Sequence, residues 1–269
     1  DRKGNKSPHS PYKRLNVTLT DPPADLLPLD IPLYSDNLID LEDAQQPIGV
    51  GIEDEYTNFI QGDQFQATWD GLLQPAITIP GFPFYVDVPF RDVFNGNAGL
   101  KTVTASYQIL RKGVAHPLVP VELNNIGVDL RKPGAPIDPD KPGNPNPDLP
   151  TVSVQGDDGG APNQLREADN TGPVIVTATI YTGAKENDEA QLHWKGEPVS
   201  EADGGIVKIG ATPPAELEWT VLWKVFEDAG NGNPIKAHYV ISHDVNDNVD
   251  VSPATDVDVL IRDGVVPEV

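Results

Sequence analysis

The sequence contains no cysteine and no methionine, and only 7% of its 269 residues are aromatic. Without cysteine no disulfide staples the fold, yet the length suffices for two domains that each bury their own core. Zero cysteine does not identify the redox compartment. Because the chain starts at Asp1 and lacks methionine, we expect a processed mature chain or a piece of a longer one.

Long apolar runs and basic residues are also scarce. No apolar stretch approaches the length that crosses a bilayer, so we expect no membrane insertion. The 19 basic residues face 41 acidic ones, and the net charge of −22 disfavours nucleic acid and anionic membranes as partners. Residues 1–23 differ from the rest because they carry a net charge of +3, which leaves −25 on the remaining residues.

Catalytic signatures are missing as well. The chain has no G-x-S-x-G, no H-E-x-x-H, no P-loop and no G-x-G-x-x-G that opens a helix. We therefore expect no enzyme, no catalytic residues and no nucleotide cofactor. The five histidines are interpreted as surface or strand residues: His9, His116, His193, His238 and His243.

What is abundant is glycine and proline, 24 and 28 residues, which favours short strands joined by many turns. Apolar residues alternate with polar ones in several stretches, as expected for strands with one buried face. No stretch has a helical period with caps, so helices should be few and short. The alternating sets are Phe65, Ala67 and Trp69; Phe82, Phe84, Val86 and Val88; Val103, Ala105, Tyr107 and Ile109; Trp219, Val221 and Trp223; and a closing strand over residues 257–261.

An internal repeat organises the chain. Tyr56 precedes Trp69 by 13 residues, and Tyr181 precedes Trp194 by the same 13, at an offset of 125. Landmarks before and after these pairs recur in the same order, so two copies of one domain are the simplest explanation. Between them, residues 131–147 carry a proline every two or three positions, which predicts an extended, semi-rigid spacer.

The repeated motifs resemble a known family. Tyr56, Gly62-Asp63 and Trp69-Asp70-Gly71, with Val88-Pro89-Phe90 and the segment from Val103 to Tyr107, resemble the tandem immunoglobulin-like repeats of large Pseudomonas-type bacterial surface and adhesin proteins. The resemblance implies an all-β fold: two tandem immunoglobulin-like β-sandwich domains joined by a proline-rich linker. The expected bounds are 1–23 for an N-terminal basic segment, 24–131 for domain 1, 132–147 for the linker and 148–269 for domain 2.

The resemblance also implies residue roles and a location. Trp69 with Tyr107, and Trp194 with Tyr239, correspond to the buried tryptophan and the corner tyrosine of such sandwiches. The expected location is extracellular, at the bacterial cell surface. The family implies stalk or adhesion roles without fixing a ligand.

One segment is a candidate metal site. Asp244, Asn246, Asn248 and Asp250 place oxygen-bearing side chains at alternate positions, as Ca²⁺ prefers, and the segment resembles part of the cadherin linkers. A calcium loop would carry Gly and Glu where this one has Val249 and Thr255. The repeat alignment also places the segment between the last two strands and not at a domain junction. The alternative is a polar hairpin loop, and apart from this candidate Ca²⁺ we expect no cofactor.

The N-terminal segment resembles a final strand without its domain. Leu15, Val17 and Leu19 alternate as Val257, Val259 and Ile261 do. The segment is either the remnant of a preceding repeat or a strand donated to a neighbouring copy, which would build a filament. The expected partners are therefore other copies or neighbouring repeats, together with a host or matrix surface ligand.

These observations predict a structural or adhesive module, either the stalk of a surface adhesin or a subunit of a self-assembling fibre. The alternative is a carbohydrate-binding module of a secreted protein, which would use exposed aromatic side chains as stacking platforms. Trp219 with Trp223, and Phe82 with Phe84, are the candidate platforms, although aromatics at strand period more often face the core.

Overall fold

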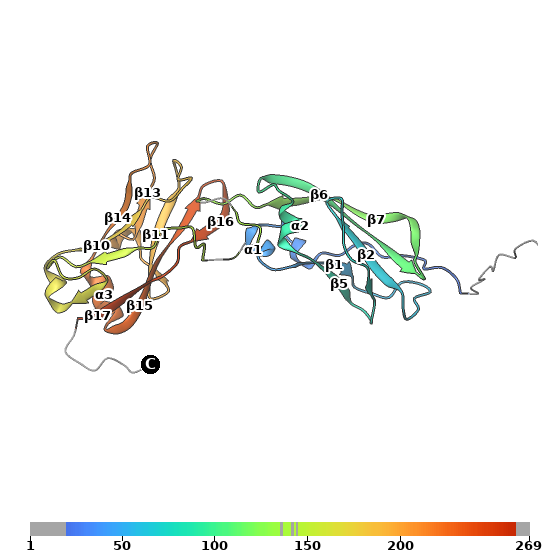
Figure 1. Cartoon of the computed structure of the whole chain (residues 1–269), viewed down its shortest axis with the longest axis horizontal. Helices are drawn as coiled ribbons and strands as arrows, with labels where there is room; N and C mark the ends of the chain where they lie inside the picture. The colour runs from blue at the N-terminus through green and yellow to red at the C-terminus, as the bar shows by residue number, and fades with distance from the viewer. Residues whose placement is uncertain (1–19, 135–136, 141–142, 144, 262–269) are drawn as a thin grey trace, which may run out of the picture.

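The computed structural model describes residues 20–134, 137–140, 143 and 145–261. Two separate hydrophobic cores are present, one formed by buried residues from Leu29 to Leu130 and one from Leu149 to Ile261. We call the parts of the chain around them the first unit and the second unit. They lie end to end along the long axis of the molecule (Figure 1). The prediction of an all-β fold with two tandem immunoglobulin-like sandwiches is confirmed.

The first unit consists mainly of strands, and its helices are a single turn or little more. Its elements in chain order are η1 (Pro32–Tyr34), α1 (Leu41–Ala44), β1 (Ile48–Ile52), β2 (Gln64–Trp69), β3 (Leu72–Leu73), β4 (Ile77–Thr78), β5 (Phe84–Val88), α2 (Phe90–Phe94), β6 (Leu100–Arg111) and β7 (Val114–Asp129).

The second unit repeats this pattern with additional short elements. They are β8 (Ser153–Gln155), β9 (Gln164–Arg166), η2 (Glu167–Thr171), β10 (Val174–Thr179), β11 (Glu189–Trp194), β12 (Glu197–Pro198), η3 (Glu201–Asp203), β13 (Ile206–Lys208), β14 (Glu216–Val221), α3 (Trp223–Ala229), β15 (Gly232–His243), β16 (Asn246–Val251) and β17 (Thr255–Leu260).

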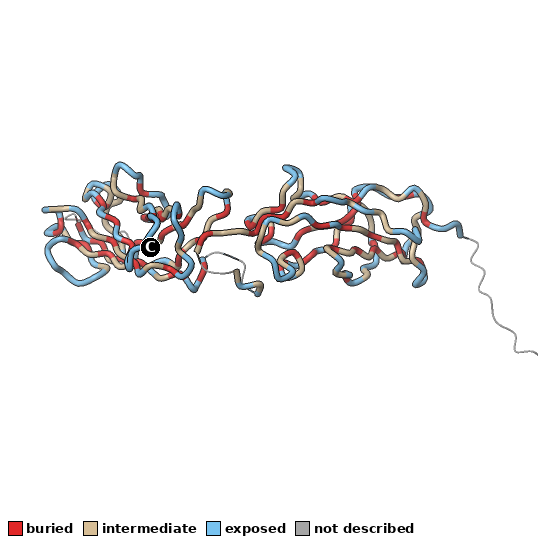
Figure 2. The backbone as a smooth tube through the Cα atoms, turned by 90° about the horizontal axis from the view of Figure 1, so that it is seen from above, coloured by how far each residue is buried: buried red, intermediate tan, exposed pale blue. Residues whose placement is uncertain are grey.

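Strand alternation produces the two cores. In β2 and β11 every second residue is buried, and both strands end on a buried tryptophan, Trp69 or Trp194. Tyr107 and Tyr239 are buried on the neighbouring strands β6 and β15. Figure 2 shows the buried backbone segments gathered inside each unit. Burying one face of each strand removes apolar surface from water and drives the two sheets together.

The sheet order of the first unit separates two layers. One layer pairs β1 with β5 in antiparallel register, and the other runs β3-β2-β6-β7. In the second unit, β10 lies between β8 and β14, whereas β12, β11, β15, β17 and β9 form the other layer. Gln155 of β8 pairs with Gln164 of β9, and this contact joins the two layers into one continuous sheet.

The predicted strand ending at Trp223 is wrong in part. β14 stops at Val221, and Trp223 is the first residue of α3. Leu222, which is 47% exposed, precedes the helix in an extended conformation. Phe226 of α3 is fully buried and packs edge-on against Trp194, so a helical turn buries an aromatic ring that an extended continuation of the strand would expose.

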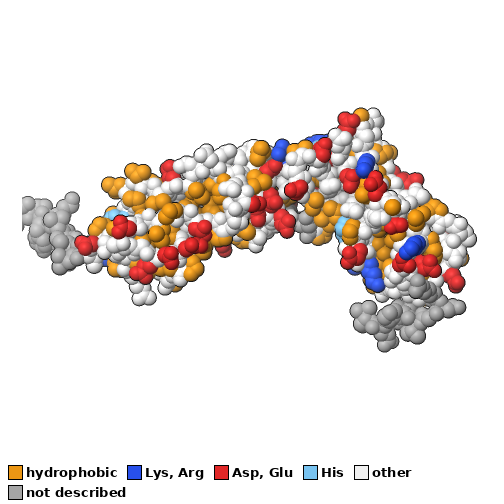
Figure 3. Space-filling model, turned by 180° about the vertical axis from the view of Figure 1, so that it is seen from behind, with side chains coloured by type: hydrophobic (Ala, Val, Ile, Leu, Met, Phe, Trp, Pro, Cys, Tyr) orange, Lys and Arg blue, Asp and Glu red, His pale blue; other side chains and the backbone are white. Residues whose placement is uncertain are grey.

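The surface carries far more acidic than basic side chains. Figure 3 shows acidic groups distributed over both units, with several near the middle of the molecule where the units meet. In the described part of the chain, no helix is both long and apolar enough to span a bilayer.

Candidate functional site: the junction of the two units

Strand β16 of the second unit lies against the end of the first unit. Its polar side chains at alternate positions share one face, and that face is the buried one: Asn248 and Asp250 are 5% and 1% exposed. A strand normally buries apolar side chains on its inner face. The polar inner face of β16 therefore needs hydrogen-bond partners, and the first unit together with the start of the linker supplies them.

Asn248 makes contacts on both sides of its side-chain amide. Its Nδ2 donates to the main-chain oxygens of Asp129 at 2.9 Å and Arg131 at 2.7 Å, while its Oδ1 accepts from the main-chain nitrogen of Leu41 at 3.0 Å. Asp129 is the last residue of β7, and Leu41 is the first residue of α1. One buried amide thus binds three main-chain groups outside its own unit.

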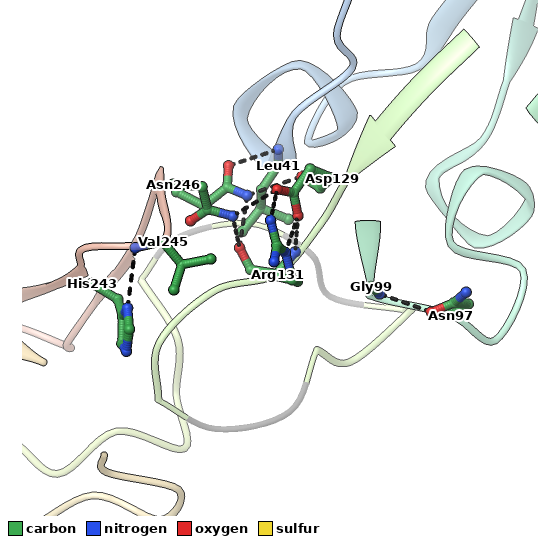
Figure 4. A network of polar contacts seen from close by, with 9 residues as sticks. Leu41, Asn97, Gly99, Asp129, Arg131, His243, Val245 and Asn246 are labelled. Carbon is green, nitrogen blue, oxygen red and sulfur yellow. Dashed lines mark hydrogen bonds and ion pairs between the residues drawn. The ribbon is translucent and has the colours of Figure 1, made fainter. Parts of the chain in front are cut away.

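Asn246 adds a second link to the same segment. Its Nδ2 donates to Oδ2 of Asp129 at 3.1 Å and to the main-chain oxygen of Arg131 at 3.0 Å (Figure 4). Burial by itself would raise the pKa of the Asp129 carboxyl, but hydrogen bonds from Arg131 and Asn246 outweigh it and hold that pKa below its usual value. The carboxylate therefore stays ionised within this network.

Asp250 anchors the linker from the other side. Its Oδ2 accepts from Nζ of Lys132 at 2.6 Å and from Nδ2 of Asn146 at 2.8 Å. Between these two, Gly134 has φ of +80°, and a Cβ at that position would lie 2.9 Å from Oδ2 of Asp250. A side chain there would be strained in backbone and in contact. Both ends of the linker are thereby fastened to β16.

Two expectations about this segment are corrected. The alternative of a polar hairpin loop is wrong in part, since β15 and β16 do form a hairpin, but only residues 244–245 form its turn and residues 246–251 form a strand paired with β15. The segment was also expected away from any domain junction, yet the contacts of Asn246 and Asn248 place it there. Aligning the two repeats places a segment only relative to its neighbours along the chain. The partners of Asn248 lie 117 to 207 residues away, so the alignment could not reveal them.

The four candidate Ca²⁺ ligands have other partners here. Asp244 is exposed at 65% and lies beside Nδ1 of His243, whereas Asn246, Asn248 and Asp250 bind the groups described above. In the described part of the chain, no group of three or more His, Cys, Asp or Glu side chains is arranged to hold a metal ion. Ca²⁺ binding by these four residues stays a prediction.

Each unit also buries an aspartate beneath the tyrosine of the repeat. Tyr56 donates to Asp63 at 2.7 Å, and Tyr181 donates to Asp188 at 2.8 Å. Both aspartates are fully buried, and burial is the main reason why the pKa of each tyrosine is strongly raised. The 13-residue repeat thus marks a buried hydroxyl–carboxylate pair as well as a tryptophan.

The two aspartates differ in their counter-charge. In the first unit, Arg111 donates from Nε to Oδ1 of Asp63 at 2.8 Å and from Nη2 to Oδ2 at 2.6 Å. Burial would raise the pKa of Asp63, but these bonds and the one from Tyr56 outweigh it, so the pKa is lowered. This two-point contact satisfies both carboxylate oxygens.

The second unit has histidine where the first has Arg111. β6 ends at Arg111 and β15 ends at His243, each four residues after the buried corner tyrosine. Among the described residues, Oδ1 of Asp188 has no hydrogen-bond partner, and Nε2 of His243 lies 3.7 Å from it. Both residues line a cavity of about 600 Å³ between the units, together with Lys132, Gly134 and Gly183.

The two cores contain the predicted core residues Trp69, Tyr107, Trp194 and Tyr239. The hydroxyl groups of the two tyrosines differ in their hydrogen bonding. The hydroxyl of Tyr107 donates to the main-chain oxygen of Leu27 at 2.5 Å, whereas within the described residues the hydroxyl of Tyr239 has no partner. Leu15, Val17 and Leu19, the predicted donor-strand residues, lie outside the described residues.

Sequence reasoning missed Asp129, Lys132 and Arg111. Asp129 and Lys132 stand at the edge of a proline-rich segment, where charged residues ordinarily face solvent. Arg111 could have been found by aligning the strand that follows each Tyr–Trp motif, because a lone arginine at the end of an alternating apolar strand indicates a buried partner.

No family model matches the chain, and no curated protein matches it. A structure described as "Ca2+-stabilized adhesin helps an Antarctic bacterium reach out and bind ice" aligns with 87% of this chain and 49% of its own, at 17% identity and a TM-score of 0.31. A second, "Structural insight into host cell surface retention of a 1.5-MDa bacterial ice-binding adhesin", aligns with 88% of this chain and 66% of its own, at 11% identity and a TM-score of 0.28.

A third structure, "D0-D1 domain of Intimin", aligns with 82% of this chain and 94% of its own, at 10% identity and a TM-score of 0.22. The chain thus spans about half the length of the first structure. TM-scores of this size establish no functional relationship.

Proposed function

We propose that this chain is a non-catalytic stalk segment of a bacterial surface adhesin, which holds other parts of the protein at a distance from the cell. The observation that supports this proposal is the junction, where buried side chains of β16 bind the end of the first unit and both ends of the linker. A spacer must resist bending between its domains, and satisfied buried hydrogen bonds provide that resistance.

The contacts at the junction are polar, and a spacer needs a fixed angle between its domains. Hydrogen bonds fix angles as well as distances, whereas apolar contacts allow sliding. The contacts of Asn248 reach β7 and α1 of the first unit, so both the strand that leaves that unit and a helix beside it are held. The linker, predicted as a spacer between separated domains, contacts both units: Ile137 packs against the first core and Lys132 pairs with Asp250 of the second unit.

The sheet edges favour a segment that does not polymerise. β7 lies at the edge of its layer and carries Pro117 and Pro120, which have no N–H to offer an added strand. At the edge of the second unit, β14 exposes Glu216 and Glu218. Prolines and charged residues on an edge strand disfavour pairing with strands of other chains.

A fibre subunit that donates Leu15, Val17 and Leu19 as a strand is the second candidate. It is favoured by the net +3 of residues 1–23, because the rest of the chain carries −25. A strand donated by another copy would have to pair with a sheet edge other than β7 or β17. Each unit already contains its own final strand at these positions. We therefore rank the stalk above the fibre.

The carbohydrate-binding alternative lacks its platforms. Trp219 is fully buried and Phe84 is 9% exposed. Phe82 is half-buried and packs edge-on against Tyr56 and Phe59, with ring centroids 5.9 and 5.0 Å apart. An exposed pair of coplanar rings is not available from these residues.

Distance measurement between the two units tests the stalk. Because the chain has no cysteine, Thr78→Cys and Glu218→Cys, both exposed, place one spin label on each unit. We expect a single narrow distance distribution by pulsed dipolar EPR and a monomer by light scattering. The variant Asn248→Ala should broaden the distribution, whereas Asp247→Ala, on the exposed face of the same strand, should not.

A broad distribution in the doubly labelled chain without a further substitution would contradict a stiff spacer. Fibres in the light-scattering sample that disappear when residues 1–23 are removed would favour the second candidate over the first.

A further inference from the structure

Two histidines of the second unit face each other across neighbouring strands. His193 of β11 and His238 of β15 are direct partners in the antiparallel register. Their ring centroids are 4.9 Å apart, and the ring planes are inclined by 34°. The residues on either side of each histidine along its strand are buried in the core, so both imidazoles stand on the outer face of the sheet, where they are half-buried.

The fold itself does not require histidine at these positions. The pair Trp194 and Ala237 of the second unit corresponds to Trp69 and Ala105 of the first. One step along the strands, the first unit pairs Thr68 with Ser106 where the second unit pairs His193 with His238. The same sheet is therefore built with two hydroxyl side chains, and packing alone does not account for two imidazoles.

The surroundings of both rings favour the neutral form of imidazole, which is the form that binds a metal ion. Burial lowers the pKa of His193 and of His238, and the adjacent His193 lowers that of His238 further. Neutral imidazole has the free lone pair that a metal ion needs. The main chain at Gly196 and the carboxylate of Glu197 raise the pKa of His193, but burial outweighs both.

We propose that His193 and His238 form a two-histidine site for a divalent transition metal ion, with the remaining coordination positions open to water or to a ligand from outside the chain. Imidazole nitrogens select Cu²⁺, Ni²⁺ and Zn²⁺ over Ca²⁺ and Mg²⁺, and Cu²⁺ binds most tightly. The carboxylate of Glu197 acts electrostatically on His193, and the net charge of −22 attracts cations to the surface.

This site is independent of the stalk proposal and of the candidate Ca²⁺ residues. It lies on the outer face of β11 and β15, whereas the junction is formed by β16. It also uses nitrogen ligands where the Ca²⁺ prediction uses oxygen. A metal ion at His193 and His238 would join two adjacent strands of the second unit without touching the linker.

Titration of the full chain with Cu²⁺ and Ni²⁺ at pH 7.5 tests the proposal, read by calorimetry and, for Cu²⁺, by EPR. We expect one site per chain, an EPR spectrum with nitrogen coupling from two imidazoles, and loss of binding as protons compete at low pH. The variant His193→Thr/His238→Ser carries the pair that the first unit already uses, so it should fold. Its Cu²⁺ affinity should fall at least about tenfold.

The matched control is His116→Ala/His243→Ala, which removes two other described histidines and should leave the site intact. The reciprocal change Thr68→His/Ser106→His should add a second site of the same kind. Retention of the Cu²⁺ affinity and of the two-nitrogen spectrum in His193→Thr/His238→Ser would overturn the proposal, as would a chain that binds no Cu²⁺ while folded.

Discussion

The imidazole of His243 lies 3.7 Å from the buried carboxylate of Asp188, at the position where the first unit sets a guanidinium against its own buried aspartate. One repeat therefore carries a complete ion pair and the other an incomplete one, on strands of the same length with the same flanking tyrosine. The two units serve as controls for each other.

The substitution His243→Arg should stabilise the second unit. The guanidinium can reach both oxygens of Asp188, and the adjacent cavity of about 600 Å³ has room for the longer side chain. Satisfying the buried carboxylate oxygen should contribute about 1–3 kcal/mol. Hydrogen exchange of β11 and β15 peptides in urea measures it, with His243→Gln as the control for size. Faster exchange in His243→Arg than in the parent chain would contradict this reading.

The two repeat tyrosines should differ in their importance. Tyr56→Phe leaves Asp63 with Arg111, so we expect a loss of about 1 kcal/mol in the first unit. Among the described residues, Tyr181→Phe leaves Asp188 with one hydrogen bond, from the main-chain nitrogen of Lys185, and with His243 at 3.7 Å, so the loss in the second unit should reach about 2–3 kcal/mol. Urea unfolding of the two variants in parallel compares them. Equal losses would contradict this difference between the two units.

Removing Arg111 should destabilise the first unit strongly. Arg111→Met keeps much of the side-chain volume but leaves Asp63 as an uncompensated buried charge, which costs about 3–5 kcal/mol. Calorimetric unfolding at neutral pH should show the transition of the first unit moving to a lower temperature. The double variant Arg111→Met/Asp63→Asn should recover part of the loss, and failure to recover any would show that Arg111 acts through packing instead.

Acid should weaken the first unit through Asp63. The pKa of this carboxyl is lowered in the folded chain, so its contribution to stability is fully present above the unfolded value of about 3.9. It is lost as the pH falls through the folded pKa, because the proton then binds more readily to the unfolded chain. A carboxyl ¹³C titration of Asp63 checks the direction. A folded pKa at or above about 4 would contradict it.

Calcium should leave the melting temperature unchanged. Nζ of Lys132 already supplies positive charge to Asp250, and the amide nitrogens of Asn246 and Asn248 face main-chain oxygens that a cation would otherwise use. Scanning calorimetry with excess Ca²⁺ and with EDTA makes the comparison. A rise in Ca²⁺ that is abolished by Asp250→Asn would establish the Ca²⁺ site that the sequence predicted.

The sequence predicted the architecture well because its signals are local or repeated. Strand alternation around Trp69 and Tyr107 places those residues in a core, and the 13-residue Tyr–Trp spacing indicates two copies of one domain. Turn residues and the absence of helical periodicity predicted an all-β chain with short helices. Trp223 was misplaced because alternation does not mark where a strand ends and a one-sided helix begins.

By itself, then, the amino-acid sequence determined which residues alternate, which segments repeat and where the proline-rich linker lies, since these properties depend on neighbours along the chain. Only the tertiary structure decided that Asn248 meets Asp129, that His243 replaces Arg111 beside a buried carboxylate, and that His193 faces His238. Each of these contacts depends on strand register or on the docking of two units, and register and docking follow from packing across distances that no local pattern records.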